Sequence, residues 1–219
     1  MNRVVVPILL AMAGVMFVRA PFMIESAPFE ASMGVVSKIF YFHVPVAITL
    51  LISAFVCGIA SSIFLARRSR TADHVAQAAA ELSIVFGVIV LATGMLWARK
   101  AWGVWWVWEA RLTITLVMWM VFVSYMLLRR FGGPGSEVLA AAVSVFGMAL
   151  VPFVYWSVNL WRTMHPTTDV LPTLPSSMLG PILWCFVAFV SLYTALLLIR
   201  VRVERCTAAL EDAYVALED

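Results

Sequence analysis

Residues 82–98 read LSIVFGVIVLATGMLWA and contain no charged side chain. A helix needs about 20 apolar residues to cross the roughly 30 Å hydrocarbon core of a bilayer, and this run lies inside a predicted span at 76–98. Comparable apolar runs occur near residues 4–24, 39–66, 112–128, 138–158 and 178–199. The sequence therefore predicts an all-α polytopic membrane protein with six transmembrane helices, folded as a single membrane domain over residues 1–219.

Composition agrees with a membrane fold. Hydrophobic residues make up 63% of the 219 residues and charged residues 12%, far too much apolar surface for one small soluble core. The first run also has features of a signal peptide, because Arg3 precedes it and Val18-Arg19-Ala20 resembles a cleavage site. We expect an uncleaved helix. Beyond the last span, residues 203–219 are expected to form a frayed acidic tail, with docking to a cytosolic subunit as the alternative.

The distribution of basic residues predicts an orientation. Short cytoplasmic loops are enriched in lysine and arginine, and cytoplasmic termini would place nine of the fifteen basic residues inside: Arg3, Arg67, Arg68, Arg70, Arg129, Arg130, Arg200, Arg202 and Arg205. The other six lie near the outer ends of spans: Arg19, Lys38, Arg99, Lys100, Arg111 and Arg162. An anionic ligand on the outer face would explain such residues, whereas simple snorkelling suffices for Arg19 and Lys38.

Four of the nine tryptophans lie in the predicted outer loop 99–111, in the run Trp102-Gly103-Val104-Trp105-Trp106-Val107-Trp108-Glu109, which continues into Ala110-Arg111-Leu112-Thr113. An interfacial aromatic belt accounts for one or two indoles. It does not account for the glycine, glutamate and arginine between them. Several flat indoles at a membrane surface indicate a wall against which a flat apolar macrocycle lies.

Two of the three histidines are predicted to lie at the same depth as this run. His43 begins the second span, in Phe42-His43-Val44-Pro45, and His165 lies in the predicted outer loop 159–177. His74 follows the basic inner loop and is expected to be solvated. Alone, either outer histidine could simply bond a carbonyl at the interface. Beside an aromatic wall, the pair suggests two axial imidazole ligands for one haem iron.

These motifs resemble the family of cytochrome c maturation protein C, also called haem exporter protein C. The family carries a W-G-x-W-W-x-W-[acid]-x-R-L-T motif, a histidine in an H-V-P context and a second histidine after W-x-T-[aliphatic]; this chain matches all three over about residues 39–195. Three departures stand out. Glu109 replaces the usual aspartate, Pro166 the common glutamine, and the usual tryptophan after Pro45 is missing.

The resemblance implies a function. Haem b would be held non-covalently on the periplasmic face of the inner membrane and passed to a periplasmic haem chaperone. Further implied partners are an ABC ATPase, its membrane subunit and a small single-span subunit; nothing indicates nucleic acid. The implied site comprises His43 and His165 as axial ligands of the iron, with Trp102, Trp105, Trp106, Trp108, Glu109 and Arg111 around them.

Other functions are less well supported by the sequence. The three cysteines form no C-x-x-C or C-x-x-C-H motif, and the chain has no nucleotide-binding or H-E-x-x-H motif. A binding and transfer protein is therefore favoured over an enzyme. Two alternatives remain: a haem lyase subunit of another cytochrome c biogenesis route, which is normally longer and richer in histidine, and a small-solute transporter, which would normally carry paired ionisable groups at the midplane.

Overall fold

The computed structural model describes residues 2–28, 34–167 and 170–218, and all regular structure within them is helical. Six helices are long and apolar enough to cross a membrane, which confirms the predicted all-α fold with six transmembrane helices. They are α1 (Asn2–Ser26), α2 (Phe40–Arg67), α3 (Arg70–Ala101), α4 (Ala110–Phe131), α5 (Ser136–Leu160) and α7 (Ser176–Glu218). Two short helices, η1 (Gly34–Ile39) and α6 (Val170–Thr173), precede α2 and α7.

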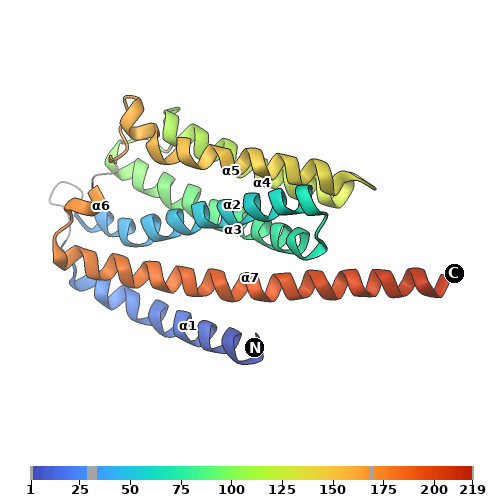
Figure 1. The fold of residues 1–219 in the computed structure, drawn as a ribbon. Coiled ribbons are helices and arrows are strands. Elements are labelled where there is room, and N and C mark those ends of the chain that lie inside the picture. Colours follow the sequence, from blue (N-terminus) through green and yellow to red (C-terminus); the bar gives the residue numbers. More distant parts are fainter. Residues whose placement is uncertain (1, 29–33, 168–169, 219) are drawn as a thin grey trace.

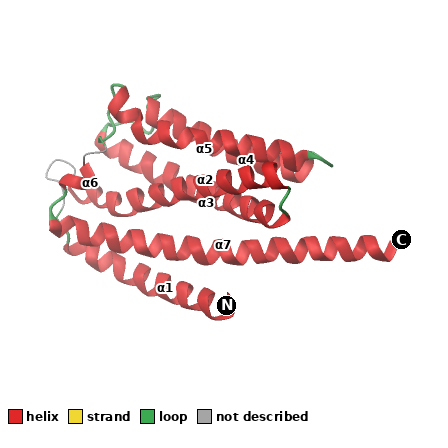
Figure 2. Cartoon of the chain, in the orientation of Figure 1, coloured by secondary structure: helices red, strands yellow, loops and turns green. Residues whose placement is uncertain are grey.

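Helices α2, α3, α4 and α5 form the body of the bundle, and α7 packs on α2 and α3 (Figure 1). Helix α1 lies outermost, against α7. The described parts of both termini point away from the end at which α3 joins α4, as Figure 2 also shows. Helix α7 runs past the bundle and stays helical to Glu218, so the expected frayed tail is wrong.

Small residues let the central helices approach closely. Ser53 of α2 donates a hydrogen bond to the backbone oxygen of Ala79 on α3 over 2.8 Å, and Ser83 donates to Ser53 over 3.0 Å. A Cβ atom at Gly58 would lie 2.3 Å from Cβ of Met148, so only glycine permits this contact between α2 and α5. Close backbone approach and buried hydroxyl bonds are the usual packing forces between helices in lipid.

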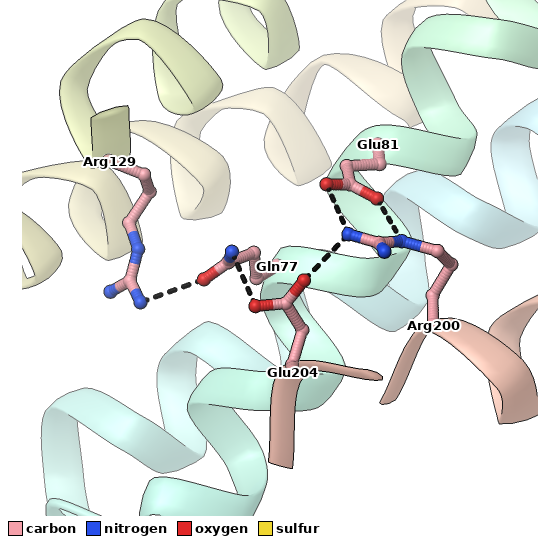
Figure 3. Close-up of polar contacts among 5 residues, drawn as sticks. All are labelled: Gln77, Glu81, Arg129, Arg200 and Glu204. Atoms are coloured by element: carbon pink, nitrogen blue, oxygen red, sulfur yellow. Dashed lines mark hydrogen bonds and ion pairs between the residues drawn. The ribbon is translucent and has the colours of Figure 1, made fainter. Parts of the chain in front are cut away.

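A polar network joins α3, α4 and α7 (Figure 3). It lies where α3 begins and α4 ends, at the end of the bundle that holds the termini. Arg200 of α7 contacts both carboxylate oxygens of Glu81 on α3 and donates over 2.6 Å to Glu204. Glu204 accepts over 2.7 Å from Gln77, whose amide oxygen accepts over 2.9 Å from Arg129 of α4. One chain of bonds therefore connects three helices.

Arg129 of α4 also makes a bidentate contact with α3. Its guanidinium donates to both carboxylate oxygens of Asp73 on α3, over 3.0 and 2.8 Å, and both side chains are largely buried. Two parallel bonds fix orientation as well as distance. Helix α3 is thus joined to α4 by Asp73 and Gln77 and to α7 by Gln77 and Glu81.

We predict that Glu204→Ala lowers the thermal unfolding temperature of the detergent-solubilised chain, because it removes one bond to Arg200 and one to Gln77. Hydrogen bonds to charged groups contribute about 1.5–3 kcal/mol each. Asp212→Ala is the matched control on the same helix: its pair with Arg70 is exposed, with side-chain exposures of 58% and 69%, and such pairs stabilise little. Equal unfolding temperatures for the two variants would contradict this role of the network.

Candidate functional site

A short irregular loop joins α3 to α4 and carries the tryptophan run. Helix α3 ends at Ala101, and Gly103 follows with φ +77°, a left-handed conformation that favours glycine. The side chain of Arg99 donates to the Gly103 carbonyl and closes this turn. Extended backbone at Glu109 then leads into α4, so the loop is braced at both ends.

A cavity of about 210 Å³ lies between α2, α3, α4 and α5 beside this loop. Two histidines and three tryptophans line it, together with aliphatic side chains: His43, His165, Trp97, Trp102 and Trp106. The two outer histidines of the sequence thus share one cavity, although 122 positions separate them. The third histidine, His74, is absent from the lining of this cavity.

His43 lies in the first turn of α2 and contacts α3. Its Nδ1 is 2.8 Å from Oγ1 of Thr93. The neighbouring Gly94 leaves room for the ring: a Cβ atom there would lie 3.3 Å from Cε1 of His43. The ring is therefore held edge-on against α3 by one hydrogen bond and one close backbone approach.

His165 belongs to the segment after α5. Its Nδ1 lies 3.0 Å from the carbonyl oxygen of Pro166 and 3.2 Å from Nη1 of Arg111, and its ring centre is 6.3 Å from that of Trp97. Burial lowers the pKa of His165 below its usual value, and the nearby guanidinium of Arg111 acts in the same direction. The imidazole is therefore neutral at pH 7, the form that ligates metals.

Arg111 joins the start of α4 to the end of α5. Its guanidinium donates to the carbonyl oxygens of Val154 over 3.2 Å and Tyr155 over 2.6 Å, besides its contact with His165. Both carbonyls lie in the last two turns of α5, which ends at Leu160. Arg111 is thus a half-buried cation at the wall of the cavity.

Glu109 binds the segment that carries His165. One carboxylate oxygen accepts from the hydroxyl of Thr163 and, over 2.9 Å, from the backbone N–H of Met164. The Thr163 hydroxyl oxygen accepts in turn from the backbone N–H of His165 over 3.0 Å. The carboxylate therefore holds the His165 segment against the tryptophan loop, and no hydrogen bond between Glu109 and Arg111 occurs among the described residues.

The tryptophan run divides into two pairs. Trp102 and Trp106 line the cavity, whereas Trp105 and Trp108 are 55% and 76% exposed. The indole N–H of Trp106 is buried and has no hydrogen-bond partner in the described part of the chain. Trp105 instead lines a separate surface hollow, together with the basic side chains of Arg99 and Lys100.

Several lining or supporting residues were not predicted from the sequence. Trp97 lies at the end of α3 and packs edge-to-face with Trp102, with ring centres 5.1 Å apart. Thr93 and Thr163 support the two histidines. The only sequence signal for Trp97 is an indole five positions before the run, and the threonines carry no local signal.

Comparison with known proteins identifies the family. The family model described as Heme exporter protein C matches residues 1–215. The chain belongs to the Heme exporter protein C family. A Heme exporter protein C of Bradyrhizobium diazoefficiens is 35% identical over 184 residues, which cover 81% of this chain and 70% of the relative. That of Escherichia coli K12 is 32% identical over 183 residues, covering 80% and 73%.

A more distant relative gives the process. A ccmC-like mitochondrial protein of Marchantia polymorpha, named for cytochrome c biosynthesis, is 30% identical over 166 residues, covering 74% of this chain and 71% of the relative. Membership of the Heme exporter protein C family favours the haem-handling role that the sequence resemblance implies. It disfavours the two alternatives, a haem lyase subunit and a small-solute transporter.

We predict that Glu109→Ala loosens the His165 segment. The N–H of Met164 loses its carboxylate acceptor, and because a hydrogen bond to a charged group contributes about 1.5–3 kcal/mol, its hydrogen exchange should accelerate about tenfold or more. Glu137→Ala, at the start of α5 on the opposite end of the bundle, is the control. Unchanged exchange at Met164 in Glu109→Ala would contradict the bracing role.

Proposed function

We propose that this protein binds haem b non-covalently between His43 and His165 and passes it to a periplasmic haem chaperone during cytochrome c maturation. Its family and the names of its relatives support a role in haem handling. One observation carries the finer proposal: two imidazole side chains from separate elements share a cavity whose other walls are mostly indoles and aliphatic side chains.

The donor set suits haem. Two imidazoles give a low-spin iron without an open coordination position, and Trp97, Trp102 and Trp106 supply flat apolar faces for the macrocycle. Covalent attachment has no support, because no cysteine lines the cavity: Cys57 and Cys185 are buried elsewhere, and Cys206 lies on the far part of α7.

Two groups suit the propionates of haem. The buried indole N–H of Trp106 has no acceptor among the described residues, and an unsatisfied buried donor costs about 1–3 kcal/mol that a carboxylate would recover. The guanidinium of Arg111 at the cavity wall supplies positive charge. We assign Glu109 a supporting role: it is not among the residues that line the cavity, and it holds the segment that positions His165.

The size of the cavity suits a cargo rather than a permanent cofactor. Its volume of about 210 Å³ is smaller than the roughly 300–1,000 Å³ usual for ligand pockets, so part of the macrocycle would project from it. The exposed Trp105 and Trp108 lie on the same loop as the lining indoles. We assign them to docking of the acceptor, which would then reach the projecting edge of the haem.

The location follows the charge distribution of the chain. Both termini are assigned to the cytoplasm and the site to the periplasmic side of the inner membrane, with the tryptophan loop 99–111 and the histidine loop 159–177 outside. An ABC ATPase, its membrane subunit and a small single-span subunit are the further partners. The protein itself acts as a binding and transfer platform rather than an enzyme.

We predict that His43→Ala and His165→Ala each lower haem occupancy and abolish the low-spin absorption spectrum of the purified protein, because each removes one of two axial nitrogen ligands. His74→Ala is the matched control, because His74 does not line the cavity. Absorption spectra of oxidised and reduced protein from haem-replete cells provide the measurement. Wild-type occupancy and a low-spin spectrum in both variants would contradict the proposed ligation.

We predict opposite phenotypes for the two tryptophan pairs. Trp102→Ala and Trp106→Ala should lose haem, whereas Trp105→Ala and Trp108→Ala should keep it but load the chaperone about fivefold or more slowly, because an interface anchor contributes more than about 1 kcal/mol. Haem copurifying with the protein and haem trapped covalently on the chaperone are scored in parallel. Proportional loss of both quantities in all four variants would place the docking surface elsewhere.

A further inference from the structure

A histidine ligates a metal only in the right tautomer. Neutral imidazole has one nitrogen that carries a hydrogen and one that carries a lone pair, and the partner of the first nitrogen decides which is which. For a histidine that binds the metal through Nε2, Nδ1 must carry the hydrogen and have an acceptor. The neighbours of each Nδ1 therefore determine whether the site is ready to bind.

The surroundings of Thr93 determine the proton position on His43. Its hydroxyl oxygen lies 2.7 Å from the carbonyl oxygen of Ile89 and 3.3 Å from that of Val90, in the preceding turn of α3. A carbonyl only accepts, so the single hydroxyl hydrogen points to these oxygens. The oxygen then offers only lone pairs to Nδ1 of His43, 2.8 Å away. The hydrogen of that contact must come from the imidazole.

The backbone of Gly94, the next residue, lies close to the ring of His43. Gly94 leaves its Cα side open to Cε1 of His43, where a Cβ atom would be only 3.3 Å away. No hydrogen bond to Nε2 of His43 is present in the described part of the chain, and the side chain lines the cavity. Nε2 therefore keeps its lone pair for a ligand.

The geometry points to Thr93 as a positioning residue that holds His43 in the Nδ1–H tautomer, which leaves the Nε2 lone pair free to bind haem iron. This inference rests on the proposed function, which makes His43 a ligand of haem iron. Hydrogen bonds to the outer nitrogen orient a metal-binding histidine and raise its basicity. Thr93 would thus set both the orientation and the donor strength of one axial ligand.

His165 differs in this respect. Its Nδ1 has two neighbours with opposite demands: the carbonyl oxygen of Pro166 requires a hydrogen on Nδ1, and the guanidinium of Arg111 requires a lone pair there. Nδ1 satisfies only one of them at a time, so the tautomer of His165 is not fixed by its surroundings. The surroundings of His43 therefore fix its tautomer, whereas those of His165 allow either tautomer.

Substitutions at two threonines test the inference in the full-length chain. Thr93→Val removes the hydroxyl at nearly constant shape, and Thr93→Ser restores it. Thr194→Val is the matched control, because its hydroxyl bonds the carbonyl oxygen of Val190 over 2.8 Å in the preceding turn of α7, and among the described residues Thr194 neither lines the cavity nor bonds a histidine. Haem dissociation rate and the reduction potential of the bound haem are measured.

We expect haem to dissociate about 10- to 100-fold faster from Thr93→Val, the usual cost of losing such a partner, and its potential to rise, because a less basic imidazole stabilises ferric iron less. Thr93→Ser and Thr194→Val should match wild type. Equal values for Thr93→Val and Thr194→Val would overturn the inference. His43→Ala is measured alongside: if it keeps low-spin haem, the proposed function itself fails.

A second measurement needs no substitution at Thr93, so a folding defect of the Thr93 variants cannot affect it. Nitrogen-15 spectra of the haem-free, histidine-labelled wild-type chain report the tautomer of each neutral imidazole, and His43→Ala assigns the signal. The inference requires the Nδ1–H form at His43. The Nε2–H form would overturn it.

Discussion

The contact between the carboxylate of Glu109 and the segment 163–165 is the interaction on which the site depends. That segment has no regular structure, and Glu109 provides the bonds that hold it to the tryptophan loop through Thr163 and Met164. Without this contact His165 would keep only its contacts with Arg111 and Trp97 to place it in the cavity.

The two ends of the bundle have different physical roles. The end that holds the termini is fixed by ion pairs among α3, α4 and α7, in which two arginines contact three carboxylates. The opposite end carries a cation, Arg111, whose hydrogen bonds go to carbonyl oxygens and an imidazole rather than to a carboxylate. One end is held by ion pairs; the other has, among the described residues, an arginine without a carboxylate bond and an indole N–H without an acceptor. This arrangement suits a platform that takes up an anionic, flat ligand.

The sequence was sufficient to predict the number and class of the helices, because each span is a long run without compensating charge and lipid permits little else. It did not predict that α7 remains helical to Glu218, since charged residues suit a helix in water as well as a tail. Nor could it separate Trp102 and Trp106 from Trp105 and Trp108: in an irregular loop, side-chain direction follows no period. Thr93 was missed because a threonine within an apolar helix gives no sign of what its hydroxyl contacts.

The central claim is that His43 and His165 bind one iron together. Electron paramagnetic resonance of the ferric, haem-loaded wild-type protein, with histidine labelled by nitrogen-15, tests it most directly. The account predicts a single low-spin species with hyperfine coupling to two axial histidine nitrogens, and loss of one coupling in each single histidine variant. A high-spin signal, or a low-spin signal that keeps both couplings after either histidine is replaced, would contradict it.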